Sequence, residues 1–250
     1  MARSTLLGVS LKSYFTHQRT LGWMRDVAAL LEENAGVRDG RVEFFVAPTF
    51  VGLKDALRIL DPHPVAAQDV SATGLGAYTG EVPAEELAEI GVSLVEIGHA
   101  ERRRYFGETD DDFRAKCSRV MEHGMWPLLC VGEPEHQNPA STAQVVVQQA
   151  RHALLGDEVS TVETPVVLAY EPYWAIGAPE PAPADYVQDV CRIVREELEP
   201  SFGNLSILYG GSAGPGTLTS LGDAVDGLFL GRFAHDPENV RRILEEAAQR

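Results

Sequence analysis

Short, almost continuously apolar runs recur along the chain and are separated by segments of mixed polarity. Three of the clearest runs are Val42 to Ala47, Trp126 to Val131 and Val166 to Tyr170. Continuous hydrophobicity, rather than strict alternation, is typical of parallel strands that are covered on both faces. On this pattern we predict eight strands, beginning near Leu6, Val42, Val65, Ser93, Trp126, Val166, Leu205 and Gly227.

The segments between these runs carry apolar residues at helical spacing. From Leu21 to Glu33, for example, Val27, Leu30 and Leu31 fall on one face of a helix. Proline is favoured in the first turn of a helix, where its missing N–H group costs nothing. We predict further helices that start at Pro83, run from Thr142 to Leu155, and run from Pro237 to Gln249.

A strand and a helix together recur about every 32 residues, which is the length of a βα unit. No linker or change in composition interrupts the eight units. We therefore predict an α/β protein with a single domain over residues 1–250, folded as a (β/α)8 barrel with a parallel eight-stranded core. An open, doubly wound sheet is the alternative that the spacing alone leaves open.

The composition and the net charge limit the kinds of molecule that the protein can bind. The 250 residues are 44% hydrophobic and 23% charged, as in a packed globular protein. Lysine and arginine number 21 against 37 acidic residues, which gives a net charge of −16. Such a surface repels nucleic acid and anionic membranes, so we expect neither as a partner. A phosphate site on this chain has to be local, built from a few cations and backbone N–H groups.

The sequence also indicates a compartment. It contains no apolar run of about 18 residues, and Met1 to Val9 does not have the pattern of a secretory signal. Its three cysteines, Cys117, Cys130 and Cys191, are odd in number and lack the spacing of metal ligands. We therefore expect a cytoplasmic protein with reduced thiols and with neither a metal nor another cofactor.

Chemistry in a parallel barrel gathers where the strands end and the βα loops begin. Polar or glycine-rich residues follow five of the predicted strands: Ser10 and Lys12; Gly98, His99 and Glu101; Glu171; Gly210 to Ser212; and Gly231 and Arg232. Each has an ordinary explanation taken alone, such as a solvated lysine or a simple turn. Together, at one rim of one barrel, they indicate a functional site.

These groups suit proton transfer next to a carbonyl group in a phosphorylated substrate. A carboxylate held away from water, as we expect for Glu171, can remove a weakly acidic C–H proton. A neutral imidazole, His99, can donate a hydrogen bond to the carbonyl oxygen, and a helix starting near Ala100 would disfavour its protonated form. Lys12 supplies positive charge, and glycine turns let backbone N–H groups approach phosphate oxygens.

Over its whole length the chain resembles the triosephosphate isomerase family. Any one of the matching segments would be a weak signal, but together, in this order and at barrel spacing, they are specific. The segments are Ala77–Glu81 (AYTGE), Gly98–Arg103 (GHAERR), Cys130–Glu133 (CVGE), Ala169–Gly177 (AYEPYWAIG) and Tyr209–Ser212 (YGGS).

The resemblance implies a role for each matching residue. Glu171 is the expected base and His99 the electrophile, the division of labour established for triosephosphate isomerases. Lys12 is the expected electrostatic clamp, supported by Glu101. The remaining implied residues are Ser10, Gly177, Ser212, Gly231 and Arg232 for substrate and phosphate, and Pro172, Trp174, Gly177 and Pro181 in a lid that closes over the substrate and ends at Pro183.

The resemblance also implies a homodimer. The segment Gly76 to Glu81 is similar to the loop that family members insert into a partner subunit next to its active site. We expect Thr79 at its tip to complete the surroundings of the partner's lysine, and the expected dimer loop comprises Tyr78, Thr79, Gly80 and Glu81. An ordinary surface turn is the alternative explanation.

Four departures from the family pattern affect the walls and the phosphate end of the pocket. Ser10 replaces an asparagine, Ala100 replaces a serine, residues 177–183 form a proline-rich lid tip, and Gly231-Arg232 replaces two glycines. We expect unchanged proton chemistry, with Arg232 able to hold a phosphate group bidentately. Two substrates remain open: dihydroxyacetone phosphate and glyceraldehyde 3-phosphate, or the tetrulose pair L-erythrulose 1-phosphate and D-erythrulose 4-phosphate. A catalytically inactive barrel that serves as a binding protein is an alternative of another class.

Overall fold

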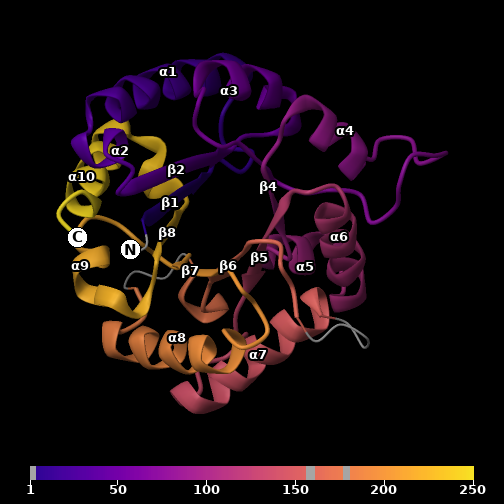
Figure 1. Ribbon diagram of the computed structural model, residues 1–250, viewed down its shortest axis with the longest axis vertical. Helices are drawn as coiled ribbons and strands as arrows, with labels where there is room; N and C mark the ends of the chain where they lie inside the picture. The colour runs from indigo at the N-terminus through magenta and orange to yellow at the C-terminus, as the bar shows by residue number, and fades with distance from the viewer. Residues whose placement is uncertain (1–3, 156–160, 177–180) are drawn as a thin grey trace.

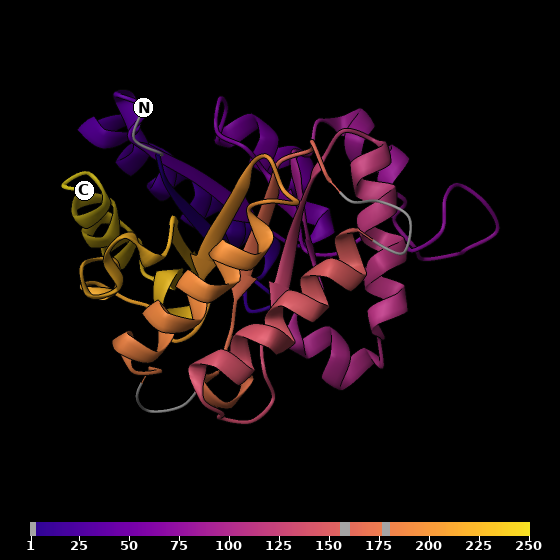
Figure 2. The same cartoon turned by 60° about the horizontal axis from the view of Figure 1, so that its bottom comes forward.

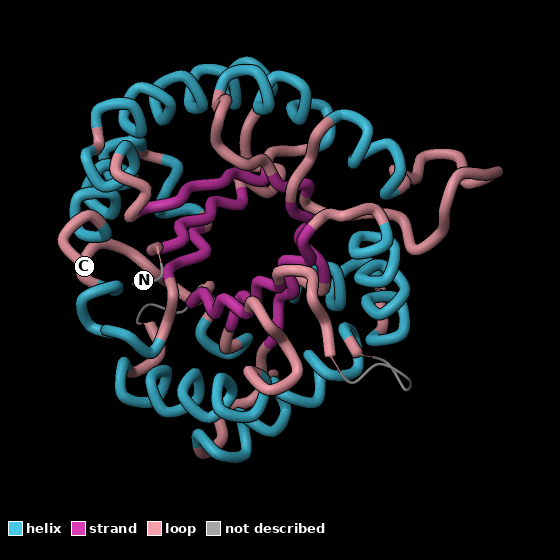
Figure 3. The backbone as a smooth tube through the Cα atoms, in the orientation of Figure 1, coloured by secondary structure: helices cyan, strands magenta, loops and turns pink. Residues whose placement is uncertain are grey.

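Eight parallel strands form the centre of the protein, and helices surround them (Figures 1 and 3). The computed structural model describes residues 4–155, 161–176 and 181–250. The strands are β1 (Thr5–Ser10), β2 (Val42–Ala47), β3 (Ala66–Ala67), β4 (Leu94–Ile97), β5 (Trp126–Val131), β6 (Val166–Tyr170), β7 (Leu205–Tyr209) and β8 (Gly227–Leu230). They pair in the order β2-β1-β8-β7-β6-β5-β4-β3, and a parallel bridge between Val46 and Val65 joins the two ends. This arrangement confirms the predicted barrel and excludes the open sheet.

The helices form the outer layer, as Figure 2 shows from a second direction. They are α1 (His17–Glu33), α2 (Ala35–Arg38), α3 (Leu53–Ile59), α4 (Ala84–Ile90), α5 (Ala100–Phe106), α6 (Asp110–Glu122), α7 (Pro139–Leu154), α8 (Ala184–Leu198), α9 (Thr217–Leu221) and α10 (Pro237–Ala247). Four short 3₁₀ turns accompany them: η1 (Phe50–Gly52), η2 (Tyr173–Ala175), η3 (Gly222–Ala224) and η4 (Arg232–His235). No helix within the described ranges is both long and apolar enough to cross a membrane.

Two predicted helix starts are wrong by about one turn, and two other boundaries by one or two residues. Helix α1 begins at His17 rather than Leu21, because the Thr16 side chain accepts the N–H of Arg19 and caps the helix. Helix α7 begins at Pro139 rather than Thr142 for the same reason, with Asn138 as its cap. Pro83 is the residue that precedes α4, not its first residue, and α10 ends at Ala247 rather than Gln249.

The apolar side chains divide into two layers. The larger layer lies between strands and helices and includes the face of α1 formed by Trp23, Met24, Val27 and Leu31. The smaller layer contains alternate strand residues such as Leu6, Phe45, Leu94, Cys130 and Phe229. Because side chains alternate across a strand, this second group fills the interior of the barrel. The pocket described below therefore lies above a closely packed layer of apolar side chains.

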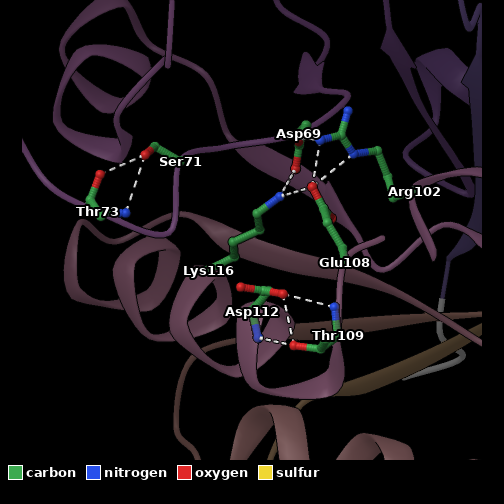
Figure 4. A network of polar contacts seen from close by, with 8 residues as sticks. All are labelled: Asp69, Ser71, Thr73, Arg102, Glu108, Thr109, Asp112 and Lys116. Atoms are coloured by element: carbon green, nitrogen blue, oxygen red, sulfur yellow. Dashed lines mark hydrogen bonds and ion pairs between the residues drawn. The ribbon is translucent and has the colours of Figure 1, made fainter. Parts of the chain in front are cut away.

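A buried ion network fixes the region between β3 and α6 (Figure 4). Lys116 Nζ lies 2.7 Å from Asp69 Oδ1 and 2.6 Å from Glu108 Oε1. Arg102 contacts the same two carboxylates, with its Nη2 atom 3.0 Å from Asp69 and its Nε atom 2.9 Å from Glu108. Burial raises the pKa of Asp69, whereas in Glu108 the hydrogen bonds from Arg102 and Lys116 outweigh burial and lower the pKa. The network anchors the start of the loop that follows β3.

Candidate active site

A pocket of about 520 Å³ opens at the carboxyl ends of the strands. Its lining combines residues that are far apart in the sequence, as expected for this face of a parallel barrel. Of the residues singled out from the sequence, it includes Ser10, Lys12, His99, Glu101, Glu171, Pro181, Ser212, Gly231 and Arg232. Gly177 lies outside the described residues.

Lys12 is held by contacts on both its side chain and its backbone. Its Nζ atom lies 2.9 Å from Oε1 of Glu101, and the pKa of the ammonium is raised because this bond and the surrounding carboxylates outweigh burial. Its φ of 47° lies in the left-handed region, which is uncommon outside glycine. The amide of Gln68 donates to the carbonyl oxygens of Lys12 and Ala47, at 3.0 and 2.8 Å. Gln68, which the sequence analysis missed, thus fixes the strained turn that aims the lysine.

His99 precedes α5 and acts as its N-cap. Its Nδ1 atom accepts a hydrogen bond from the backbone N–H of Glu101 at 3.1 Å, so the proton of the neutral ring sits on Nε2. Burial and the positive charge of Lys12 lower the pKa of His99 to about 4. The ring is therefore neutral near pH 7 and can offer Nε2–H to an acceptor.

Glu171 follows β6 directly and is 3% exposed. Its Oε2 atom lies 3.5 Å from His99 Nε2 and has no hydrogen-bond partner in the described part of the chain. Burial raises the pKa of this carboxyl to about 8; Lys12 opposes the shift, and the carboxylates of Glu96 and Glu101 add to it. Such a group is a much stronger base than a solvated carboxylate.

Two glycines make room for Glu171. A Cβ atom on Gly210 would lie 2.7 Å from Cγ of Glu171, and one on Gly132 would lie 1.9 Å from its carbonyl oxygen. The amide of Gln149 also pairs with the backbone of Gly132 in both directions, at 2.9 and 3.0 Å. Close backbone packing thus fixes the position of the carboxylate.

The far end of the pocket is built from the turns after β7 and β8. Ser212 Oγ lies 3.3 Å from the carbonyl oxygen of Ala175, which joins the β7 turn to the segment after Glu171. Gly231 directly follows β8, and the exposed Arg232 begins η4 at the rim of the pocket. Ser212, Gly231 and Arg232 all line the pocket.

The segment after Glu171 is anchored by a carboxylate that the sequence analysis did not single out as a functional residue. Glu133 is fully buried, and its Oε1 atom accepts from Trp174 Nε1 at 2.6 Å, from Tyr186 at 3.0 Å and from Tyr170 at 3.3 Å. Trp174 and Pro172 thus lie at the base of the expected lid, while Pro181 lines the pocket beyond it.

A second missed carboxylate lies beneath the pocket. Glu96 is 3% exposed within β4, and its Oε2 atom accepts a hydrogen bond from Ser10 Oγ at 2.9 Å. Burial raises its pKa to about 7, against the hydrogen bond from Ser10 and the charge of Lys12. A single carboxylate within the apolar run Leu94–Ile97 was the available signal.

The expected dimer loop projects away from the barrel between β3 and α4 (Figures 1 and 2). Residues 75–81 are exposed, including the apolar Leu75 at 74% and Tyr78 at 51%. Such exposure of large apolar side chains on a projecting loop is typical of a contact surface.

All three cysteines are buried and unpaired. Among the residues that the structure describes, no group of three or more histidine, cysteine, aspartate or glutamate side chains is arranged to hold a metal ion. The pocket chemistry described above rests on a carboxylate, an imidazole and an ammonium.

Comparison with known proteins identifies relatives over nearly the whole chain. The model of the triosephosphate isomerase family matches residues 5–247. The chain is 44% identical to an L-erythrulose-1-phosphate isomerase of Pectobacterium atrosepticum, over 98% of this chain and 96% of the relative. It is 38% identical to a protein of the same name from Rhizobium etli, over 95% and 90%. A triosephosphate isomerase of Saccharopolyspora erythraea is 35% identical, over 99% and 98%.

Proposed function

The chain belongs to the triosephosphate isomerase family, and we propose that it is a sugar-phosphate isomerase that interconverts L-erythrulose 1-phosphate and D-erythrulose 4-phosphate. The observation that carries the chemistry is the convergence of Glu171, His99 and Lys12 at one pocket, with Glu171 and His99 3.5 Å apart. The identity to relatives named for the tetrulose phosphate, 44% and 38%, supports the choice of substrate.

Glu171 is the base in this proposal. In L-erythrulose 1-phosphate the carbonyl is at C2, and the carboxylate removes the proton from C3. The electron pair of the broken C–H bond forms a C2–C3 double bond, and the C2 oxygen becomes anionic. Return of a proton to C2 and loss of the proton from the C3 oxygen moves the carbonyl along the chain. The raised pKa of Glu171 supports this role because a catalytic base works best with a pKa near the working pH.

His99 and Lys12 stabilise the enediolate. The Nε2–H of the neutral ring donates to the two neighbouring oxygens and relays a proton between them. Lys12 supplies a compact positive charge where the oxyanion develops, and its bond to Glu101 holds it there. Preorganised donors and charges of this kind in a dry site commonly contribute the largest part of such a rate enhancement.

The phosphate lies at the other end of the pocket in this proposal. In this proposal Ser212 and Gly231 offer backbone N–H groups, and Arg232 at the rim supplies charge-assisted hydrogen bonds. The family resemblance adds Gly177, which lies outside the described residues. The segment with Pro172, Trp174 and Pro181 covers the bound substrate, which excludes water and strengthens each electrostatic contact.

Triosephosphate isomerisation is the second candidate, and the 35% identity to a protein of that name favours it. Steady-state assays of the purified enzyme with both substrates separate the two. We expect kcat/KM for L-erythrulose 1-phosphate to exceed that for dihydroxyacetone phosphate by at least about 100-fold, since the chemistry is shared and only the pocket discriminates. A higher kcat/KM for the triose phosphate would overturn the choice of substrate.

We further propose that residues 1–250 form one domain that assembles into a homodimer in the cytoplasm. The exposed side chains of Tyr78, within the loop Gly76–Glu81, and of Leu75, which directly precedes it, support the dimer, with Thr79 of each copy contributing to the site of the other. Three buried, unpaired thiols support a reducing compartment.

A further inference from the structure

The interior of the barrel contains a polar pair in a layer that is otherwise apolar. On β4, Glu96 follows the inward-facing Leu94 at a spacing of two, and on β1 Ser10 shares the parity of the inward-facing Leu6. Both side chains therefore point into the barrel, and the 2.9 Å bond between them crosses it beneath the pocket. Ser10 also lines the pocket, so the pair connects the barrel interior to the substrate space.

Burying a carboxylate in this position lowers the stability of the folded protein. Burying a charge is unfavourable unless it is paired and hydrogen-bonded, and an apolar residue would fill the same layer without that cost. Glu96 also raises the pKa of Glu171, so the two carboxylates interact. Buried, perturbed carboxyl groups close to a pocket are typical of functional sites rather than of cores.

The bond to Glu96 determines what Ser10 presents to a ligand. A hydroxyl has one hydrogen and two acceptor sites, and an ionised carboxylate can only accept. The pKa of Glu96 is about 7, so above this pH the carboxylate is ionised and takes the only hydrogen of Ser10. Ser10, which lines the pocket, can then only accept a further hydrogen bond through its side chain, whereas an asparagine at this position would also offer N–H donors.

We propose that Ser10 and Glu96 form a specificity-determining pair that accepts a hydrogen bond from the terminal hydroxyl of a four-carbon ketose phosphate. This inference rests on the proposed function and identifies the part of the site that selects its substrate. Glu96 acts through Ser10 and is a positioning residue, while Ser10 contacts the substrate.

The oxygen atoms of the two candidate substrates explain the selection. Carbonyl and phosphate oxygens carry no hydrogen at neutral pH and cannot donate to Ser10. The hydroxyl on the carbon that loses its proton is hydrogen-bonded to His99 in the proposed mechanism. Dihydroxyacetone phosphate has no further hydroxyl, whereas L-erythrulose 1-phosphate has one more, on its additional carbon. Only the tetrulose phosphate can therefore satisfy the acceptor at Ser10.

The test is the ratio of kcat/KM for L-erythrulose 1-phosphate to kcat/KM for dihydroxyacetone phosphate, measured at pH 8.5. In Glu96→Leu the Ser10 hydroxyl loses its hydrogen bond to the carboxylate. We expect the ratio to fall about 10- to 100-fold, which is the effect on kcat/KM of losing a hydrogen bond to a charged group. In Glu96→Gln the amide oxygen can still accept from Ser10, and we expect the ratio to stay within about threefold of wild type. Circular dichroism and thermal melting verify that both variants fold.

The outcomes separate this inference from the proposed function. An unchanged ratio in a folded Glu96→Leu variant, with both substrates affected in proportion, means a purely structural role and overturns the inference alone. An equal fall of the ratio in Glu96→Gln also overturns it. A wild-type enzyme that turns over only dihydroxyacetone phosphate overturns the proposed tetrulose function and this inference together.

Discussion

The Nε2 atom of His99 lies 3.5 Å from the Oε2 atom of Glu171, and both side chains are buried. The other ring nitrogen, Nδ1, accepts the backbone N–H of Glu101, so the ring proton must sit on Nε2, the nitrogen next to the carboxylate. A group that can take a proton and a group that can donate a hydrogen bond thus meet at one pocket.

The pH dependence of kcat/KM should report Glu171. The pKa of its carboxyl is raised from an ordinary 4.5 to about 8, and only the ionised form can remove a proton. Activity is therefore complete well above pH 8, half-maximal near pH 8 and about 100-fold lower at pH 6. His99, with its pKa lowered to about 4, stays neutral over this range. An acidic limb with a midpoint near 4.5 would contradict the buried, desolvated base.

Replacing Lys12 should remove most of the activity. Two unit charges about 4 Å apart interact by about 4 kcal/mol at an effective dielectric near 20. Lys12→Met should therefore lower kcat/KM about 10³-fold, and Lys12→Arg should restore little because its planar fork is a poor substitute for a compact ammonium. Lys54→Met, at an exposed position of α3, is the matched control and should behave as wild type. Comparable losses at the two lysines would exclude a specific role for Lys12.

Gly210→Ala should reduce activity without unfolding the protein. The new Cβ would lie 2.7 Å from Cγ and 2.9 Å from Oε1 of Glu171, so the carboxylate has to shift. A displacement of about 1 Å in a catalytic group costs about 100-fold in rate. Gly203→Ala, where the added Cβ meets nothing within 4 Å, should leave kcat unaltered. Full activity in Gly210→Ala would mean that the position of Glu171 is not critical.

The network around Lys116 should stabilise the fold rather than act in catalysis. Removing one partner of a buried ion pair leaves uncompensated charge and costs about 3–5 kcal/mol. Lys116→Met, which leaves Asp69 and Glu108 without its ammonium, should therefore lower the free energy of unfolding by about that amount in urea titrations. Loss of the exposed Arg192 on α8, also ion-paired, should leave the unfolding curve nearly unchanged. Equal effects of the two substitutions would argue against the network.

The oligomeric state tests the loop between β3 and α4. Sedimentation equilibrium of the wild-type protein should give twice the chain mass of 27.2 kDa. Tyr78→Asp, at a side chain that is 51% exposed, should shift the equilibrium towards the monomer because a charge is placed in an apolar contact. A monomeric wild-type protein, or a variant as dimeric as wild type, would refute the role of this loop.

Much of the fold could be predicted because it depends on local patterns. The apolar runs located all eight strands, although β3 is only Ala66–Ala67 and its neighbour Val65 contributes a single bridge. The predicted helix starts were less accurate. Thr16 and Asn138 each begin a helix through one side-chain hydrogen bond, and both precede in sequence the apolar residues from which the helices were predicted. A search for capping residues upstream of each apolar stripe would have corrected both.

The candidate site was predictable only in part. Residues at strand ends, such as Lys12, His99 and Glu171, meet because every parallel strand delivers its end to the same rim. Gln68, Glu96 and Glu133 were missed as functional residues because their roles depend on contacts with residues distant in sequence. For Glu96 the sequence does contain a signal, an acidic residue in an apolar strand at an inward-facing position.

Proton exchange with solvent offers the sharpest test of Glu171 as the base that forms an enediolate. L-erythrulose 1-phosphate is incubated with the enzyme in D₂O, and the C–H positions next to the carbonyl are followed by proton NMR. Deuterium should appear at the newly formed C–H bond of D-erythrulose 4-phosphate in every turnover in which the proton on Glu171 exchanges with solvent before it returns, and Glu171→Gln should abolish both turnover and exchange. Turnover or exchange that persists in Glu171→Gln would contradict the mechanism.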